Sequence, residues 1–295
     1  MIKINKITRG RFGNRVLQFN SLYQLSKTLN VNFYCDHWEG YNLFKDIENL
    51  SSAKSERGEE LLTWDNYLSM SENDLSSLHN LKDICIDDPA YMLHNVFYKV
   101  TNHHPREFLK LKDEWKMNIP NDCENIGIHI RGDDIISRDG NGGREIHTPD
   151  YYISAIEEIE SQKEKNTRYI LCTDDVQFDT SIKVFEYLRE KGYSLFLGPA
   201  TSQPDRVNHF ADFSALTQCD YLIASSSTYA IAAGLIGNEK KIIHSKTWID
   251  KNINHEPWHK TKDPLHIRAM QLSFDNFWIE VSECNNEFYK PWRIL

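Results

Sequence analysis

The chain has 295 residues, 40% of them hydrophobic and 26% charged, which excludes an intrinsically disordered protein and allows a sizeable core. Its formal net charge of −9 comes without a compensating basic run, which argues against a nucleic-acid partner. The cysteines form no C-x-x-C pair, and Cys35, Cys172 and Cys219 lie in apolar segments, so we expect buried free thiols rather than disulfides.

The N-terminal segment predicts a strand, a helix and a second strand. A short apolar strand at residues 2–7 leads into Gly10-Arg11-Phe12-Gly13-Asn14, where Asn14 is the expected helix N-cap. Apolar residues then recur at spacings of three and four and form one helix face; they are Val16, Phe19, Leu22, Leu25 and Leu29. Residues 31–35 return as a strand, so this βαβ opening favours a parallel sheet.

The pattern weakens between residues 41 and 116, where we expect short helices and loops. The turn Ile119-Pro120-Asn121-Asp122 is the predicted domain boundary. Residues 1–118 are therefore assigned to an N-terminal, acceptor-side domain with a Rossmann-like sheet.

Strands and helices alternate clearly in the second half. The strands are expected at 126–130, 168–172, 193–197, 221–224 and 241–244. Thr148-Pro149 predicts the start of one helix, and Asp179 caps another that ends at Gly192. This alternation predicts an α/β fold of two Rossmann-like parallel-sheet halves facing each other across a cleft. The second half spans residues 119–260, and residues 261–295 are a tail that packs back on the first.

Charged residues follow the first buried strand of this half, in Ile128-His129-Ile130-Arg131-Gly132-Asp133-Asp134. Ligands of open α/β sheets bind beyond the carboxyl ends of the strands. Arg131 at such an end suits a phosphate, and His129, two residues earlier on the same face, adds a donor. An internal ion pair of Arg131 with Asp133 or Asp134 explains the pattern equally well.

A second polar segment runs from Asp212 through a strand into Ser225-Ser226-Ser227-Thr228 and an Ala-rich helix. Hydroxyls and unpaired N–H groups at a helix N-terminus form a phosphate site. The alternative is that these residues only supply the helix cap.

These segments occur in one order with His147-Thr148-Pro149-Asp150-Tyr151-Tyr152 and Thr173-Asp174-Asp175 between them. That order resembles the fucosyltransferase superfamily of bacterial α1,2-fucosyltransferases, core α1,6-fucosyltransferases and protein O-fucosyltransferases. Residues 10–14 likewise resemble the N-terminal G-G-L-G-N motif of the α1,2-fucosyltransferases. The resemblance covers residues 1–30 and 125–245.

The resemblance implies a GT-B fold and a GDP-sugar donor, expected to be GDP-fucose, with no further cofactor and no metal. It places Arg131 on the donor pyrophosphate with His129 beside it, and Asp212 on the nucleotide. The phosphate loop matches Ser226, Ser227 and Thr228, and the donor-binding set is completed by Gly10, Gly13 and Asn14.

One position departs from the family pattern, which is H-x-R-R. Gly132 stands where the second arginine is expected, so a cation and a bidentate donor are missing. We therefore expect the donor contacts, the identity of the sugar, or both to differ from the family.

An inverting transfer needs a base for the acceptor hydroxyl. Asp139 and Glu145, in a glycine-rich loop after the first motif, and Asp36, after the second N-terminal strand, are the candidates. The glycine composition of this loop is typical of a gate over an active site. It is equally typical of an ordinary surface loop. Thr173-Asp174-Asp175 is explained by helix capping and strand-end polarity.

We therefore expect an inverting, metal-independent glycosyltransferase of polysaccharide biosynthesis that acts on a glycan acceptor. The chain has no apolar run of about 18 residues and no signal-peptide pattern, which with the free thiols predicts a cytoplasmic protein. Membrane contact would be peripheral, through a lipid-linked acceptor. The alternatives are a related enzyme with another nucleotide sugar, a non-catalytic nucleotide- or carbohydrate-binding protein, and a metal hydrolase built on His129, Asp133 and Asp134.

Overall fold

The computed structural model divides into two compact units, one up to Lys112 and the other beginning at Asp113. The predicted boundary at 118/119 stays a prediction. The structure describes residues 2–4, 7, 11–28, 30–51, 60–62, 84–86, 105–119, 122–132, 147–163, 165–201, 209–225, 227–237, 241–245 and 278–281.

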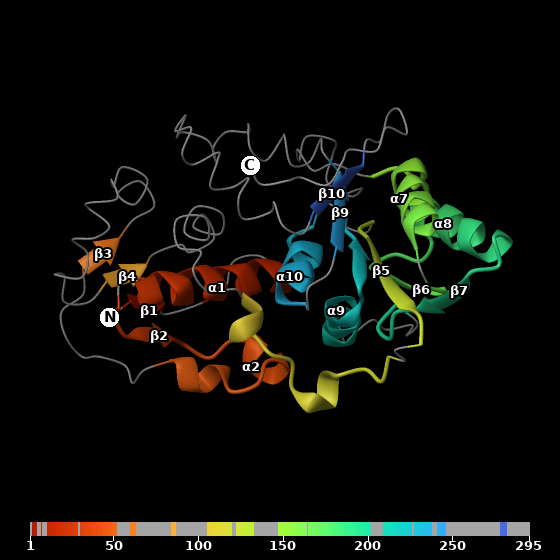
Figure 1. Cartoon of the computed structure of the whole chain (residues 1–295). Coiled ribbons are helices and arrows are strands. Elements are labelled where there is room, and N and C mark those ends of the chain that lie inside the picture. Colours follow the sequence, from red (N-terminus) through yellow and green to blue (C-terminus); the bar gives the residue numbers. More distant parts are fainter. Residues whose placement is uncertain are drawn as a thin grey trace. The chain divides into compact units, whose positions relative to one another are not determined.

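The first unit contains a four-stranded sheet in the order β2-β1-β4-β3, with every pair parallel (Figure 1). Its strands are β1 (Ile2–Ile4), β2 (Phe33–Cys35), β3 (Glu60–Leu62) and β4 (Ile84–Ile86). The predicted βαβ opening is confirmed, because α1 (Phe12–Thr28) joins the parallel pair β1 and β2. The region expected to hold only helices and loops also supplies β3 and β4, so that expectation was incomplete.

The described part of the helical face predicted for α1 is buried, since Val16, Phe19 and Leu22 are at most 1% exposed. The side chains of Leu25 and Leu29, also predicted on this face, lie outside the described residues. Asn14 is not the N-cap. The helix begins at Phe12, which places Asn14 within its first turn. Among the described residues of this unit, the shorter helices are α2 (Gly40–Leu43), η1 (Ile47–Leu50) and η4 (Pro105–Glu107). The short helix η5 (Asp113–Trp115) begins the second unit.

The second unit contains a six-stranded parallel sheet in the order β10-β9-β8-β5-β6-β7. Its strands are β5 (Glu124–Ile130), β6 (Thr167–Thr173), β7 (Ser194–Leu197), β8 (Tyr221–Ile223), β9 (Lys241–Ser245) and β10 (Trp278–Val281). Counted from β5, the chain builds β6 and β7 on one side and then β8, β9 and β10 on the other. This is the strand order of a Rossmann fold, with its reversal point between β5 and β8.

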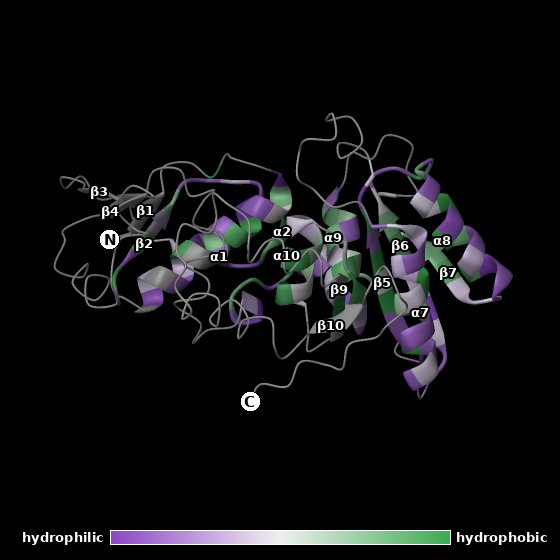
Figure 2. Ribbon diagram, turned by 90° about the horizontal axis from the view of Figure 1, so that it is seen from above, coloured by the Kyte–Doolittle hydropathy of each residue, from purple (hydrophilic) through white to green (hydrophobic). Residues whose placement is uncertain are grey.

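Two pairs of helices cover the two faces of this sheet (Figure 1). They are α7 (Pro149–Gln162) and α8 (Asp179–Glu190) on one face, and α9 (His209–Gln218) and α10 (Thr228–Ile236) on the other. Thr148 occupies the N-cap position of α7 as expected, although its side chain makes no capping hydrogen bond. The N-cap position of α8 is occupied by Phe178, and Asp179 is the first residue of that helix. In Figure 2 the central strands and α10 are largely hydrophobic, while α7 and α8 carry hydrophilic outer residues.

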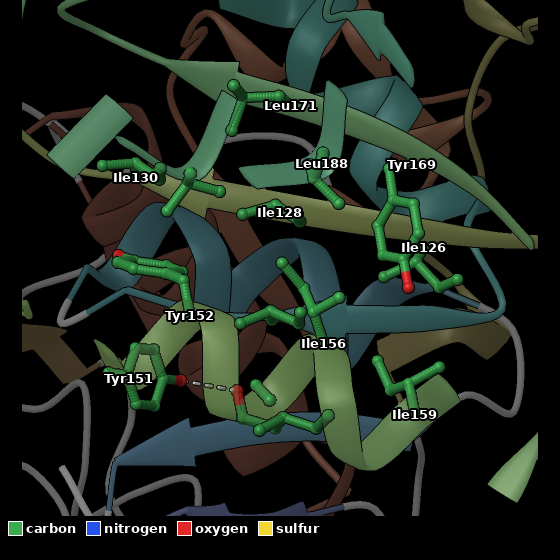
Figure 3. Packing of buried hydrophobic residues seen from close by; sticks show 14 residues of the cluster. Ile126, Ile128, Ile130, Tyr151, Tyr152, Ile156, Ile159, Tyr169, Leu171 and Leu188 are labelled. Carbon is green, nitrogen blue, oxygen red and sulfur yellow. Dashed lines mark hydrogen bonds between the residues drawn. The ribbon is translucent and has the colours of Figure 1, made fainter. Parts of the chain in front are cut away.

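Side chains of β5 alternate between these two layers. Ile126, Ile128 and Ile130 pack into the core with α7 and α8, where Tyr151 and Tyr152 are fully buried (Figure 3). Residues on the opposite pleat therefore face α9 and α10. This alternation turns His129 towards the face on which the hydroxyl-rich loop enters α10.

Within the part of the chain described, no helix combines the length and apolar character needed to cross a membrane. Cys35, Cys172 and Cys219 are buried free thiols, as predicted.

Candidate functional site

The candidate site lies at the carboxyl ends of β5, β6 and β8. Chain reversal between β5 and β8 leaves no crossover helix over the gap between these strands, and Rossmann folds bind nucleotides there. Polar side chains of this unit collect at that place.

His129 and Ser225 form a hydrogen bond across the reversal point. Nδ1 of His129 lies 2.6 Å from Oγ of Ser225, and the two side chains are 4% and 2% exposed. His129 is the next-to-last residue of β5 and Ser225 lies just after β8, so this bond joins the two strands that border the gap. Burial lowers the pKa of His129 to about 4, while the charge of Asp174 acts in the opposite direction. The imidazole is therefore neutral at pH 7 and acts as a hydrogen-bonding group rather than as a cation.

The neutral His129 makes unfolding depend on pH. Its pKa in the folded chain lies below the ordinary 6.5, so between these values the unfolded chain binds the extra proton and stability falls as pH falls. From pH 7 to pH 5 we expect this group to remove about 2 kcal/mol of unfolding free energy. Denaturant titrations of wild type and His129→Asn at both pH values isolate the contribution, with the exposed His37→Asn as control. Equal pH dependence in wild type and His129→Asn would contradict it.

The α10 N-terminus borders the same gap. Ser227 is its N-cap, and its Oγ accepts a hydrogen bond of 3.3 Å from the backbone N–H of Tyr229. Thr228 is the first residue of the helix. The predicted loop-to-helix transition is thus confirmed. Helix N-termini favour anions because their N–H groups and macrodipole point outwards.

Tyr229 connects this helix to the rest of the site. Its ring lies 5.2 Å from that of His129 and 5.2 Å from that of Phe213, and its hydroxyl donates to the backbone carbonyl of His209. The charge of Arg131 also acts on Tyr229. Tyr229 thereby links β5, α9 and α10, a role that no sequence pattern indicates.

Arg131 follows β5 and pairs with a carboxylate that follows β6. Its Nη1 lies 2.9 Å from Oδ2 of Asp174, with the two side chains 12% and 21% exposed. Oδ1 of Asp174 accepts a hydrogen bond of 2.7 Å from the backbone N–H of Gly132. Asp133 and Asp134, the ionic partners that the sequence predicts for Arg131, lie outside the described residues. Asp174 could not be predicted, because the two strand ends are adjacent only in the sheet.

The aromatic ring of Phe178 lies close to Gly132. The φ angle of Gly132 is not positive, so the backbone itself does not demand glycine. A Cβ at this position would lie 3.0 Å from Cγ of Phe178. A larger residue at position 132, such as the second arginine of the family pattern, would therefore require Phe178 to move.

Asp212 is buried on α9 and anchors the loop that follows β7. Its Oδ1 accepts a hydrogen bond of 2.7 Å from the N–H of Ala200, and its Oδ2 accepts bonds of 3.1 and 2.7 Å from the N–H and hydroxyl of Thr201. Burial raises the pKa of Asp212, and these hydrogen bonds oppose the rise. The loop passes so close that a Cβ on Gly198 would lie 2.5 Å from the same Oδ1.

The tyrosines of the His147–Tyr152 segment support the strand ends from the other face. Tyr152 donates its hydroxyl proton to the carbonyl of His129 at 3.2 Å. The single hydroxyl proton of Tyr151 is shared between the carbonyls of Ala224 at 2.8 Å and Ile243 at 3.1 Å. The segment therefore positions the backbone beneath the site.

Among the described residues, the first unit holds three of the predicted site residues. Gly13 and Asn14 lie in the first turn of α1. Asp36 follows β2, and its Oδ1 accepts a hydrogen bond from the hydroxyl of Tyr34, whose pKa is raised to about 12 mainly by that bond.

Several predicted residues lie outside the described ranges. They are Gly10, Asp139, Glu145 and Ser226, the loop around Asp139, and most of residues 261–295. The described ranges contain no group of three or more His, Cys, Asp and Glu side chains arranged to hold a metal ion.

No family model matches the chain, and no curated protein matches it in sequence. Among solved structures it is similar to NodZ α-1,6-fucosyltransferase soaked with GDP-fucose, at 15% identity over 80% of this chain and 92% of that chain, with a TM-score of 0.44. It is also similar to POFUT1 in its apo form, at 9% identity over 79% of this chain and 93% of that chain, with a TM-score of 0.45. For POFUT1 in complex with GDP-fucose, the identity is 9% over 80% of this chain and 93% of that chain, with a TM-score of 0.46.

Proposed function

We propose that this chain is an inverting, metal-independent glycosyltransferase that transfers L-fucose from GDP-fucose to a hydroxyl group of a glycan acceptor. The proposal includes the GT-B arrangement, in which the two parallel-sheet units face each other across a cleft. The donor is assigned to the second unit and the acceptor to the first.

The observation that carries the proposal is the convergence of anion-binding groups at the reversal point of a Rossmann-ordered sheet. The His129–Ser225 hydrogen bond spans that point, and the N-terminus of α10 and the Arg131 guanidinium border it. A nucleoside diphosphate needs these groups, because its two phosphates carry the charge that a helix N-terminus and a guanidinium bind. The motif order described above supports guanine as the base and fucose as the sugar.

The proposed reaction is a single displacement at the anomeric carbon. The acceptor oxygen forms a bond to this carbon as the bond to the β-phosphate oxygen of GDP breaks, and a base takes the acceptor proton. Negative charge then collects on the departing GDP. Arg131 and the α10 N-terminus stabilise that charge, and preorganised donors of this kind lower the barrier directly.

Asp36 is the base candidate that the described residues contain, beside Asp139 and Glu145 in the loop outside them. It stands at the carboxyl end of a parallel strand, where ligands of α/β sheets bind. The adjacent hydroxyl of Tyr34 orients one of its carboxylate oxygens.

Nucleotide selectivity tests the proposal. GDP at 100 times its Kd should stabilise the native chain by about 3 kcal/mol, which thermal unfolding shows as a rise in Tm. UDP and ADP should raise the Tm less, and a chelator should leave the effect of GDP unchanged. Release of GDP from GDP-fucose, with and without glycans, then separates an enzyme from a binding protein. Equal Tm shifts from all three nucleotides would refute the assignment to GDP.

The close approach of Phe178 to Gly132 favours one second candidate function. In it the reaction is the same, but the donor is a different GDP-sugar. The position of the family's second arginine is occupied here by glycine with an aromatic ring packed over it. A panel of GDP-sugars in the same assay distinguishes the two donors.

A further inference from the structure

Asp174 contacts both residues that follow β5. One carboxylate oxygen lies 2.9 Å from the Arg131 guanidinium, and the other accepts a 2.7 Å hydrogen bond from the Gly132 amide. The strand register explains this, because Ile130 of β5 pairs with Thr173 of β6, so the next residue of each strand lies at the same level. The sheet therefore places a carboxylate beside the arginine across two parallel strands.

Shielding makes this ion pair different from an ordinary surface pair. The side chains of Arg131 and Asp174 are 12% and 21% exposed, against 55% and 68% for the pair of Lys183 and Asp179 on α8. Exposed pairs contribute little because water and salt screen them. A shielded pair holds its geometry, so the contact restricts where the long Arg131 side chain can lie.

A restricted guanidinium suits a ligand with two phosphates. Arginine binds phosphate oxygens through a planar fork, and this requires the plane of the fork to be set in advance. A free arginine side chain carries about 2 kcal/mol of rotamer entropy, which binding would otherwise have to overcome. The second bond of Asp174, to the Gly132 amide, fixes the carboxylate itself and hence the direction in which it holds the guanidinium.

We propose that Asp174 is a positioning residue, which holds the guanidinium of Arg131 in the orientation that binds the diphosphate of the donor. The inference rests on the proposed function and assigns a role to a residue that the sequence explains only by helix capping and strand-end polarity. Asp174 acts through Arg131 and not on the nucleoside.

The test separates the charge of Asp174 from its structural hydrogen bond. Asp174→Asn keeps an oxygen for the Gly132 amide but removes the charge beside Arg131. The matched control is Asp175→Asn, in the next residue, whose carboxylate accepts a hydrogen bond of 2.9 Å from the N–H of Gln177. The probes are inorganic pyrophosphate and guanosine, titrated by calorimetry, with Tm measured for each protein.

Asp174→Asn should weaken pyrophosphate binding about tenfold, the usual scale for losing a residue that orients a ligating group. Guanosine affinity should stay within about twofold of wild type. Asp175→Asn should change neither. In an Arg131→Ala background, Asp174→Asn should have no further effect, because the two residues act as one unit.

A second variant, Asp174→Glu, keeps the charge and moves it by one methylene, so it covers the case in which Asp174→Asn does not fold. It should show the same selective loss for pyrophosphate to a smaller degree. Equal losses for pyrophosphate and guanosine, or unchanged pyrophosphate affinity, would overturn the positioning role while leaving the proposed function intact. If wild type binds neither GDP nor pyrophosphate, the proposed function fails and the positioning role fails with it.

Discussion

Arg131→Ala is expected to lower kcat/KM by about 30- to 1,000-fold, which corresponds to about 2–4 kcal/mol of lost transition-state stabilisation. The physical reason is that the Arg131 guanidinium stabilises the negative charge that develops on the departing diphosphate. Because this charge is larger in the transition state than in the bound donor, kcat should fall as well as donor affinity. Steady-state kinetics with GDP-fucose measure both.

Two further variants separate this effect from loss of structure. Arg131→Lys keeps a cation near Asp174 but loses the planar fork, so it should recover stability better than activity. Arg168→Ala is the matched control, because Arg168 is an arginine of the same sheet with an 18% exposed side chain, near the start of β6 and away from the site. It should retain turnover. If Arg131→Ala unfolds, and added stabilising substitutions restore its turnover, then the ion pair with Asp174 is only structural.

Asp212→Asn is expected to lower the free energy of unfolding by about 3 kcal/mol in the absence of any ligand. The carboxylate accepts three hydrogen bonds from Ala200 and Thr201. An asparagine presents an NH₂ group to one side of this set, so at least one buried donor faces another donor. Hydrogen bonds to charged groups contribute about 1.5–3 kcal/mol each, and an unsatisfied buried group costs a similar amount. Denaturant unfolding at pH 7 measures the loss.

This result bears on the role that the family resemblance implies for Asp212, which is contact with the nucleotide. Asp179→Asn is the control, since Asp179 is an exposed carboxylate at the start of α8, and its substitution should change stability by less than about 0.5 kcal/mol. Unchanged stability of Asp212→Asn together with weaker GDP binding would show that Asp212 serves the nucleotide directly and that its loop contacts are secondary.

The strands and helices of the second unit, together with α1 of the first, follow from local sequence pattern. Apolar runs such as Ile126–Ile130, and the three- and four-residue spacing of apolar residues on α1, indicate which positions are buried. Burial of those positions dominates the stability of each element. The short strands β3, β4 and β10 were missed because no local pattern marks them. Each is defined by pairing with a strand that is distant in the sequence: β3 with β4, β4 with β1, and β10 with β9.

Half of the site could also be expected from the sequence. A histidine and an arginine at a strand end, and hydroxyls before an apolar helix, indicate an anion site because parallel strands bring their carboxyl ends together. This pattern names Arg131, His129 and Ser227. The pattern does not show which group each of these side chains contacts.

Those partners were decided by the tertiary structure. Ser225 reaches His129 because β8 lies beside β5, Asp174 reaches Arg131 because β6 lies on the other side, and Asp212 meets a loop from beyond β7. Local periodicity encodes which face of each strand is apolar, but the order of strands is set by the packing of the whole sheet against its helices. The sequence by itself therefore determined the elements and the kind of chemistry at their ends, and only the folded sheet decided that His129 is buried and neutral, Arg131 is held by a carboxylate, and Asp212 anchors a loop.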